Sequence, residues 1–235
     1  PPPPPPPPPT PPRLDSSAAS DVYKRQQQRN PTLCVVTSGY GAQRLTRPTS
    51  IHTQHHLPMK ICIISDSHDN RPLLAAAVRE ARAAGTEAIL HCGDVVAPST
   101  LEVIKPYGIP IHVIHGNNTG DLYMMGRISA QTSNLTTYYG QDAGLNLGGK
   151  RIFLVHYPHY AEAMATTGDW DLVCCGHDHK VDIRTIRNIT GGATHFVNPG
   201  TVGGIKAQAT WVLGDLDTMT FTVNEVQADD AAVAE

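Results

Sequence analysis

The sequence lacks several features that would place it in a common class of protein. No uninterrupted apolar stretch approaches the roughly 20 residues that a membrane-spanning helix needs. Aromatic residues amount to 6% of the chain, and no two of its five cysteines form a CxxC pair. We therefore expect a soluble globular protein with no transmembrane segment and no zinc site of paired cysteines.

Basic residues are scarce in most of the chain. Residues 1–58 hold six Lys or Arg against two Asp or Glu, so residues 59–235 hold twelve against nineteen. This acidic excess argues against bulk nucleic-acid binding through a basic surface. It suits a site in which carboxylates hold cations.

A disulfide framework is also not indicated. Four of the cysteines, Cys62, Cys92, Cys174 and Cys175, lie in or beside apolar runs. We interpret them as buried, reduced thiols of a cytoplasmic protein. Metal binding by the adjacent Cys174 and Cys175 is the alternative, although neighbouring residues of a strand point to opposite faces.

Residues 1–58 lack the apolar content of a folded domain. Nine prolines open the chain, and a Ser-, Gln- and Arg-rich stretch continues to Pro58, so we expect a disordered segment. Residues 21–26 (DVYKRQ) are also what a common transposon-type sequencing adapter encodes in one frame. We therefore interpret the segment as non-native or read-through sequence, with a transit peptide as the alternative. A protein starting at Met59 should be as stable and active as the full chain.

From Met59, short apolar runs alternate with helix-like segments. The pattern predicts strands at 60–64, 88–91 and 111–114, and helices at 72–84, 99–104 and 121–130, with Ser99 as an N-cap. Such alternation indicates βαβ units and a parallel sheet.

The second half is richer in strands, with Gly148-Gly149 as a hairpin turn. Strands are predicted at 136–139, 144–147, 151–155, 172–175, 181–186, 194–197, 210–213 and 218–223. Together the halves predict one α/β domain at 59–226, built from two packed mixed β-sheets flanked by helices. A flexible tail is expected at 227–235.

Metal-capable side chains follow five of the predicted strands. They are Asp66 and His68, Asp94, Asn117, His156, and the pair His177 and His179. Each fragment alone has an ordinary explanation as a turn, a capping loop or a core histidine. Because ligands bind beyond the carboxyl ends of strands in open α/β sheets, we expect all five loops to meet at one edge. The two histidines of the last loop are expected on one side of an extended segment.

These residues resemble the metal-site motifs of calcineurin-like metallophosphoesterases. Asp66-x-His68, Gly93-Asp94, Gly116-Asn117, His156 and Gly176-His177-x-His179 match the five motifs in order. The stretches ISDSHDN, HCGDV, GNN and NPGT are most similar to small single-domain prokaryotic phosphodiesterases of the YfcE type. The resemblance covers residues 59–224 and implies a four-layer sandwich with a dinuclear metal centre.

The resemblance also implies a role for each residue. Asp66, His68 and His179 would bind one metal, and Asn117, His156 and His177 the other, while Asp94 would bridge both. Two divalent ions are implied, with Mn²⁺ favoured and Ni²⁺, Fe²⁺ or Zn²⁺ as alternatives. Asp94 and Asn117 are expected to be catalytic as well, since two ions activate a shared water and clamp the attacking and leaving oxygens.

The resemblance thus predicts a metal-dependent phosphodiesterase that hydrolyses a small soluble phosphate ester by in-line attack of a metal-activated water. A protein-interaction scaffold of the same fold, like a retromer subunit, is the alternative. Many members follow the ligand Asn with His–Glu or His–Asp, whereas Asn118 and Thr119 stand here. Neither is an acid, so His159 is the candidate proton donor. The natural substrate and a homo-oligomeric state stay open.

Overall fold

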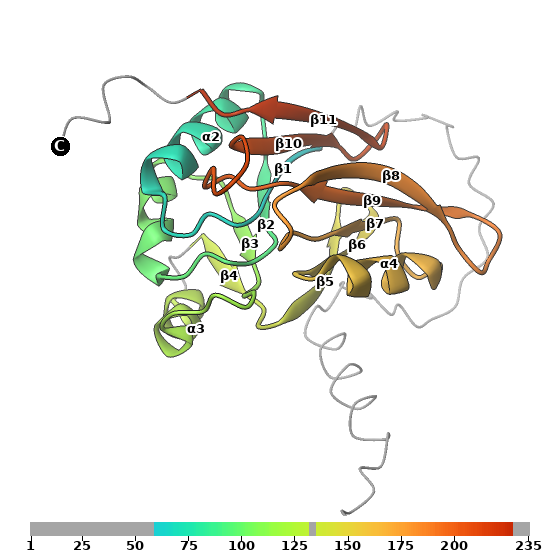
Figure 1. Cartoon of the computed structure of the whole chain (residues 1–235), viewed down its shortest axis with the longest axis horizontal. Coiled ribbons are helices and arrows are strands. Elements are labelled where there is room, and N and C mark those ends of the chain that lie inside the picture. The colour runs from blue at the N-terminus through green and yellow to red at the C-terminus, as the bar shows by residue number, and fades with distance from the viewer. Residues whose placement is uncertain (1–58, 132–134, 228–235) are drawn as a thin grey trace, which may run out of the picture. The chain divides into compact units, whose positions relative to one another are not determined.

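The computed structural model describes residues 59–131 and 135–227. The expectations for residues 1–58, and for all but the first residue of the predicted tail, lie outside this part of the chain. Two sheets carry helices on their outer faces (Figure 1). The predicted two-sheet α/β architecture is therefore confirmed. No helix of the described residues has the length and apolar character to cross a membrane.

The first sheet has six strands in the order β11-β10-β1-β2-β3-β4. They are β1 (Lys60–Ile64), β2 (Ala88–His91), β3 (Ile111–Val113), β4 (Thr136–Tyr138), β10 (Thr210–Asp215) and β11 (Thr220–Glu225). Strands β1 to β4 pair in parallel, whereas β10 pairs antiparallel with both β1 and β11. The carboxyl ends of β1, β2 and β3 therefore lie at one edge of the sheet.

Three helices belong to this half: α2 (Arg71–Ala83), the 3-10 helix η1 (Pro98–Tyr107) and α3 (Leu122–Ala130). The prediction of Ser99 as an N-cap is wrong, because η1 begins after Ala97 and has no side-chain cap of its own. Instead the Asp69 carboxylate accepts hydrogen bonds from the Ala97 backbone N–H, at 2.9 Å, and from the Thr100 hydroxyl. The cap thus comes from a loop that a local sequence pattern does not reveal.

The second sheet has five strands in the order β5-β6-β7-β9-β8. They are β5 (Asp142–Leu147), β6 (Lys150–Val155), β7 (Leu172–Cys174), β8 (Val181–Arg187) and β9 (Ala193–Pro199). Gly148 and Gly149 join β5 to β6 as predicted, with φ of 54° and 72°, the values that two-residue hairpin turns favour. An unpredicted helix, α4 (Pro158–Thr166), follows β6 and covers the outer face of this sheet.

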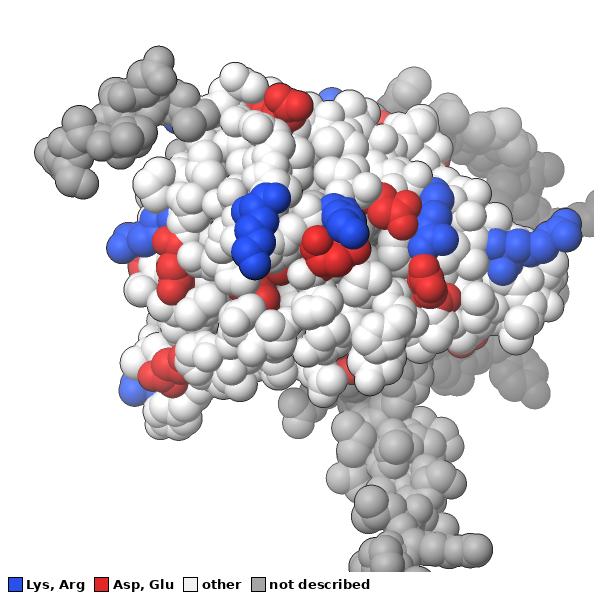
Figure 2. All heavy atoms as spheres, in the orientation of Figure 1, with Lys and Arg blue, Asp and Glu red and all other residues white. Residues whose placement is uncertain are grey.

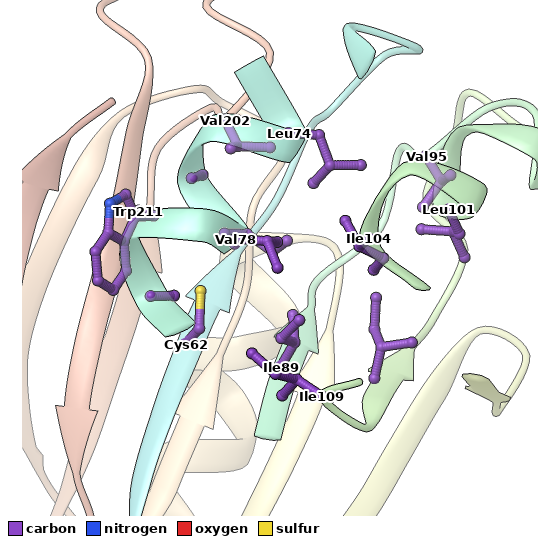
Figure 3. Packing of buried hydrophobic residues seen from close by; sticks show 14 of the residues in the cluster. Cys62, Leu74, Val78, Ile89, Val95, Leu101, Ile104, Ile109, Val202 and Trp211 are labelled. Atoms are coloured by element: carbon purple, nitrogen blue, oxygen red, sulfur yellow. The ribbon is translucent and has the colours of Figure 1, made fainter. Parts of the chain in front are cut away.

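Strand β1 shows how the layers are held together. Ile61 and Ile63 face the second sheet, whereas Cys62 and Ile64 face α2, and all four side chains are fully buried. A strand buried on both faces needs a continuous apolar run, which explains the KICII sequence. Figure 3 shows the packing on the helix side, where Val78 of α2 lies over Cys62 and Ile89.

Charged side chains of both signs are interspersed on one face of the described residues (Figure 2). Figure 2 shows Lys and Arg residues beside Asp and Glu residues on one face, rather than a continuous basic stripe. Arg184 illustrates the mixing, because it pairs with both Glu162 and Asp182. This face therefore lacks the basic footprint that binds a nucleic-acid backbone.

Candidate metal centre

The structure brings together the side chains that follow five strands. Asp66 and His68 follow β1, Asp94 follows β2, Asn117 follows β3, His156 follows β6, and His177 and His179 follow β7. The expectation that these loops meet at one edge is confirmed by five contacts between polar atoms of different loops, each below 4 Å. Two sheets therefore contribute to a single site.

Asp66, His68 and His179 form one cluster. The Nε2 atoms of the two histidines lie 3.3 Å apart, and Oδ1 of Asp66 lies 3.3 Å from Nε2 of His179 and 3.7 Å from Nε2 of His68. Asp66 is fully buried, and its Oδ1 has no hydrogen-bond partner among the described residues. A buried carboxylate oxygen in this state costs free energy unless a cation or a donor satisfies it.

The remaining residues form an adjoining cluster. Oδ1 of Asn117 lies 3.0 Å from Nε2 of His156 and 2.8 Å from Nδ1 of His177. Oδ1 of Asp94 lies 3.4 Å from Nε2 of His156, and Oδ2 of Asp94 lies 3.6 Å from Nε2 of His68. The two oxygens of Asp94 thus face one histidine from each cluster.

Backbone carbonyls fix the orientation of two rings. Nδ1 of His156 lies 2.8 Å from the Cys92 carbonyl oxygen, and Nδ1 of His179 lies 2.9 Å from the Ile205 carbonyl oxygen. Nδ1 must donate in both bonds, so a neutral ring presents the lone pair of Nε2 to the centre. Converging imidazole lone pairs and carboxylate oxygens fit divalent cations.

The charges of the centre reinforce one another. Burial alone would raise the pKa of Asp94, but hydrogen bonds from His156 and Asn118 outweigh it and hold that pKa below its usual value. Burial likewise disfavours a charged His156, yet the hydrogen bond and charge of Asp94 raise the pKa of His156 above its usual value. The charge of each of these two residues thus stabilises the charged form of the other.

Backbone strain is concentrated in these loops. Asp66, His68, Asp94, His177 and His179 all have φ between 42° and 77°, a region that non-glycine residues rarely occupy. The expectation of an extended segment at 177–179 is therefore wrong. Because this segment bends, His179 contacts the Asp66 cluster while His177 contacts Asn117. Such strain persists where the surroundings enforce a functional geometry.

Glycine is required where the loops approach one another most closely. A Cβ on Gly116 would lie 2.1 Å from Oδ1 of Asp94 and 2.6 Å from Nε2 of His156. A residue with a Cβ at this position would displace the side chains of Asp94 and His156.

Several supporting residues were not identified from the sequence. Asn118 donates to both carboxylate oxygens of Asp94, at 2.9 Å from its backbone and 2.6 Å from its side chain. Buried His91 bonds the Ser67 hydroxyl at 3.0 Å, and burial, with the charge of His156 adding to it, lowers the pKa of His91 to about 3. His91 lies in the HCGDV stretch, and this position could have indicated a supporting role. A residue inside a predicted strand is, however, usually assigned to core packing.

The NPGT stretch, residues 198–201, holds two of the site loops in place. Buried Asn198 donates to the Gly176 carbonyl oxygen at 3.0 Å and to Asp178 at 2.8 Å. The Thr201 hydroxyl donates to the backbone carbonyl oxygen of Asp66 at 2.8 Å. The side chains of this stretch therefore hold in place the loops that carry Asp66 and His177.

His159 does not belong to the cluster. It lies exposed in the first turn of α4, with its ring centroid 4.2 Å from that of Tyr160 and 5.7 Å from that of Tyr157. Tyr157 is the aromatic residue beside the centre, with its ring 4.7 Å from the His177 ring. Among the described residues, the ring contacts that connect His159 with the centre pass through Tyr157.

Four cysteines lie within the described residues. Cys62, Cys92, Cys174 and Cys175 are buried and free. Cys174 packs between the sheets and Cys175 packs under α4, on opposite faces as expected. These two thiols therefore do not converge on a common metal site.

Residues 59–219 match the family described as the calcineurin-like phosphoesterase superfamily domain. The chain belongs to this superfamily. It is 25% identical over 170 residues to a phosphodiesterase of Methanocaldococcus jannaschii, a match that covers 72% of this chain and 98% of the relative. A solved structure described as a novel archaeal phosphodiesterase aligns with a TM-score of 0.63 and 22% identity, covering 71% of this chain and 99% of that one. The phosphoesterase YfcE from E. coli aligns over 72% of this chain and all of its own, with 16% identity and a TM-score of 0.47.

Proposed function

We propose that the chain is a phosphodiesterase that hydrolyses a small phosphate ester with two divalent metal ions. The observation that carries this proposal is the complete set of seven converging side chains at one edge of the two sheets. Membership of the superfamily supports the phosphoesterase chemistry. The phosphodiesterase of M. jannaschii, matched over nearly its whole length, supports the substrate class.

Each side chain has a proposed place around the ions. Asp66, His68 and His179 would hold one ion, and Asn117, His156 and His177 the other. Asp94 is the proposed bridge, because its two oxygens face His68 and His156 from different clusters. Asp66 is the weaker candidate for a bridge. Its ligand atom lies within 4.8 Å of those of Asp94 and His156, but its ion pairs among the described residues are with His68 and His179 of one cluster.

When bound, the two ions would supply an activated water and neutralise charge on the phosphoryl oxygens. The protein's own contribution is positioning. Asn118 fixes the carboxylate of Asp94, and the carbonyl oxygens of Cys92 and Ile205 fix two imidazole rings. Asn117 and Asp94 adjoin the space in which a phosphate ester would react. Rigid donors of this kind lower the barrier because they need no rearrangement during the reaction.

The mixed nitrogen and oxygen donors suit Mn²⁺, Fe²⁺, Ni²⁺ or Zn²⁺, and we propose Mn²⁺ as the working metal. We also propose that the protein acts in the cytoplasm on a soluble ester, in a compartment that keeps its four buried thiols reduced.

A metal-by-substrate screen tests the proposal. Metal-free protein would be loaded with each of the four ions and assayed with bis(4-nitrophenyl) phosphate and 4-nitrophenyl phosphate. We expect turnover of the diester to exceed that of the monoester, and to be highest with Mn²⁺. If neither ester is hydrolysed with any ion while the ions still bind, the scaffold alternative is the correct one.

A further inference from the structure

The histidines of the metal centre are not all held in the same way. Backbone carbonyl oxygens fix the rings of His156 and His179 from outside the centre. His177 instead directs Nδ1 toward Oδ1 of Asn117, at 2.8 Å, so Nε2 is the nitrogen left for an outer partner. Within the part of the chain that the structure describes, Nε2 of His177 has no hydrogen-bond partner. No outer hydrogen bond therefore fixes the orientation of this ring.

The surroundings of His177 make this difference important. His177 is exposed, whereas His68, which also lacks a carbonyl partner for its ring, is half-buried and packs against His179 with ring centroids 5.2 Å apart. The His177 backbone N–H donates to Oδ2 of Asp66 at 2.9 Å, which holds the backbone but does not restrict rotation of the ring. An exposed side chain keeps its rotamer freedom unless a neighbour packs against it.

Tyr157 provides this packing. Its ring centroid lies 4.7 Å from that of His177, with the ring planes at 64°, and 5.3 Å from that of His156, with the planes at 70°. The His156 and His177 rings lie 5.2 Å apart at 73°. All three contacts have the edge-to-face geometry that aromatic rings prefer. Each of the three rings therefore restricts the other two.

The position of Tyr157 is itself fixed by the start of α4. Tyr157 lies between His156, which follows β6, and Pro158, the first residue of the helix. The Tyr157 carbonyl oxygen accepts hydrogen bonds from the backbone N–H groups of Tyr160 and Ala161, both at 3.1 Å. Ala161 is fully buried and anchors this turn of the helix in the core. The Tyr157 ring therefore projects from a rigid backbone and can orient a neighbouring side chain.

We propose that Tyr157 is the positioning residue of His177, and that its ring replaces the carbonyl oxygen that orients His156 or His179. The inference rests on the proposed pair of metal ions and adds that the two ions depend unequally on Tyr157. The ion of the cluster that contains His177 needs the Tyr157 ring, whereas the ion of the Asp66 cluster does not. Because the contact is made by the ring, the Tyr157 hydroxyl is not required.

Calorimetric titration of metal-free protein with Mn²⁺ is the first test. Tyr157→Ala should weaken one of the two ions about tenfold, as for other residues that orient metal ligands, and leave the other within about twofold. Tyr157→Phe keeps the ring and should restore both affinities. Tyr160→Ala is the matched control, because it removes a 51% exposed ring that packs on Tyr157 rather than on His177. Equal weakening of both ions in Tyr157→Ala, or failure of Tyr157→Phe to restore them, would overturn the proposal.

A second readout needs neither metal nor activity. In metal-free protein with labelled histidines, three-bond couplings should report one His177 rotamer in the parent protein and in Tyr157→Phe, and averaged rotamers in Tyr157→Ala. The couplings of His179, which the Ile205 carbonyl oxygen holds, should not change. A single His177 rotamer in Tyr157→Ala would refute the positioning role even if the protein hydrolyses diesters. Selective loss of one ion in a protein that hydrolyses no ester would refute only the proposed function.

Discussion

Asn118 holds Asp94 by both of its carboxylate oxygens, through a backbone bond of 2.9 Å and a side-chain bond of 2.6 Å. Because an amide is not an acid at neutral pH, we expect Asn118 to orient Asp94 rather than to donate a proton. Asn118→Ala should remove one bond and lower Mn²⁺ affinity about 10- to 100-fold, as for other residues that orient metal ligands. Calorimetric titration of metal-free protein measures this change. Thr119→Ala is the neighbouring control, and equal affinities in the two variants would contradict the orienting role.

Replacing Asp94 itself should have a larger effect than replacing Asn118. Asp94→Asn keeps the shape of the side chain but removes the charge that faces His68 and His156. We expect the fold to survive, the metal content to fall, and turnover to drop by at least about 100-fold. Metal analysis and diester hydrolysis measure both effects, with the exposed turn residue Asp217→Asn as the matched control. If Asp94→Asn kept two ions and near-native turnover, Asp94 would not be the bridge.

The strands and the ligand loops could be predicted because their signals are local. Strands β1 and β2 begin and end at the predicted residues, since each is a short apolar run bounded by polar residues. Helix α4 was missed because only Ala161 and Ala165 of this helix are buried, and alanine gives a weak apolar pattern. Pro158 stands in the first turn of α4, where proline is tolerated, but one proline alone does not predict a helix.

The contacts that shape the site could not be predicted in the same way. Asn118 and Asp94 are brought together by the pairing of β2 with β3, and the Asp66–His179 contact joins the two sheets. The bend at 177–179 likewise depends on the His177 backbone donating to Oδ2 of Asp66 at 2.9 Å. These relationships depend on three-dimensional packing, whereas residue type and spacing report only local preference.

Gly176 should tolerate no side chain, for reasons of space alone. A Cβ there would lie 1.9 Å from the Ser65 hydroxyl and 2.5 Å from Oδ2 of Asp66. Gly176→Ala should therefore destabilise the protein by about 1–3 kcal/mol through overpacking. Gly126→Ala, where nothing lies within 4 Å and the backbone is helical, should instead stabilise it by about 0.5–1 kcal/mol. Denaturant unfolding of both variants checks the opposite signs.

The raised pKa of His156 predicts opposite pH trends for the metal-free and metal-loaded protein. Below the ordinary value of 6.5, the His156–Asp94 pair contributes fully to stability, and this contribution is lost as pH rises through the raised pKa. Metal binding needs the neutral ring, so metal affinity should rise over the same range. Melting temperatures between about pH 6.5 and 8 should therefore fall for metal-free protein and rise with Mn²⁺, whereas below 6.5 the lowered pKa of His91 acts in the opposite direction. Asp94→Asn removes the partner of His156 and should flatten the metal-free trend. A metal-free melting temperature that rises through this range would contradict the assignment.

The last prediction concerns the proton for the leaving group. Asn118 and Thr119 cannot donate one at neutral pH, and the ring contacts between His159 and the centre pass through Tyr157 in the part of the chain that is described. Departure should therefore depend on the stability of the leaving group itself, so rates should fall steeply as leaving-group pKa rises across aryl phosphodiesters. General-acid assistance is typically worth about 10²–10⁴-fold and would flatten this dependence.

Replacing His159 tests whether it is the donor. His159→Ala should steepen the dependence of rate on leaving-group pKa only if His159 is the donor. His195→Ala is the control for loss of a remote histidine, because the His195 ring packs on Phe221. A shallow dependence that His159→Ala leaves unaltered, with chemistry shown to limit turnover, would mean that another acid protonates the leaving oxygen. Tyr157 would then be the first residue to replace, because its ring contacts the rings of both His156 and His177.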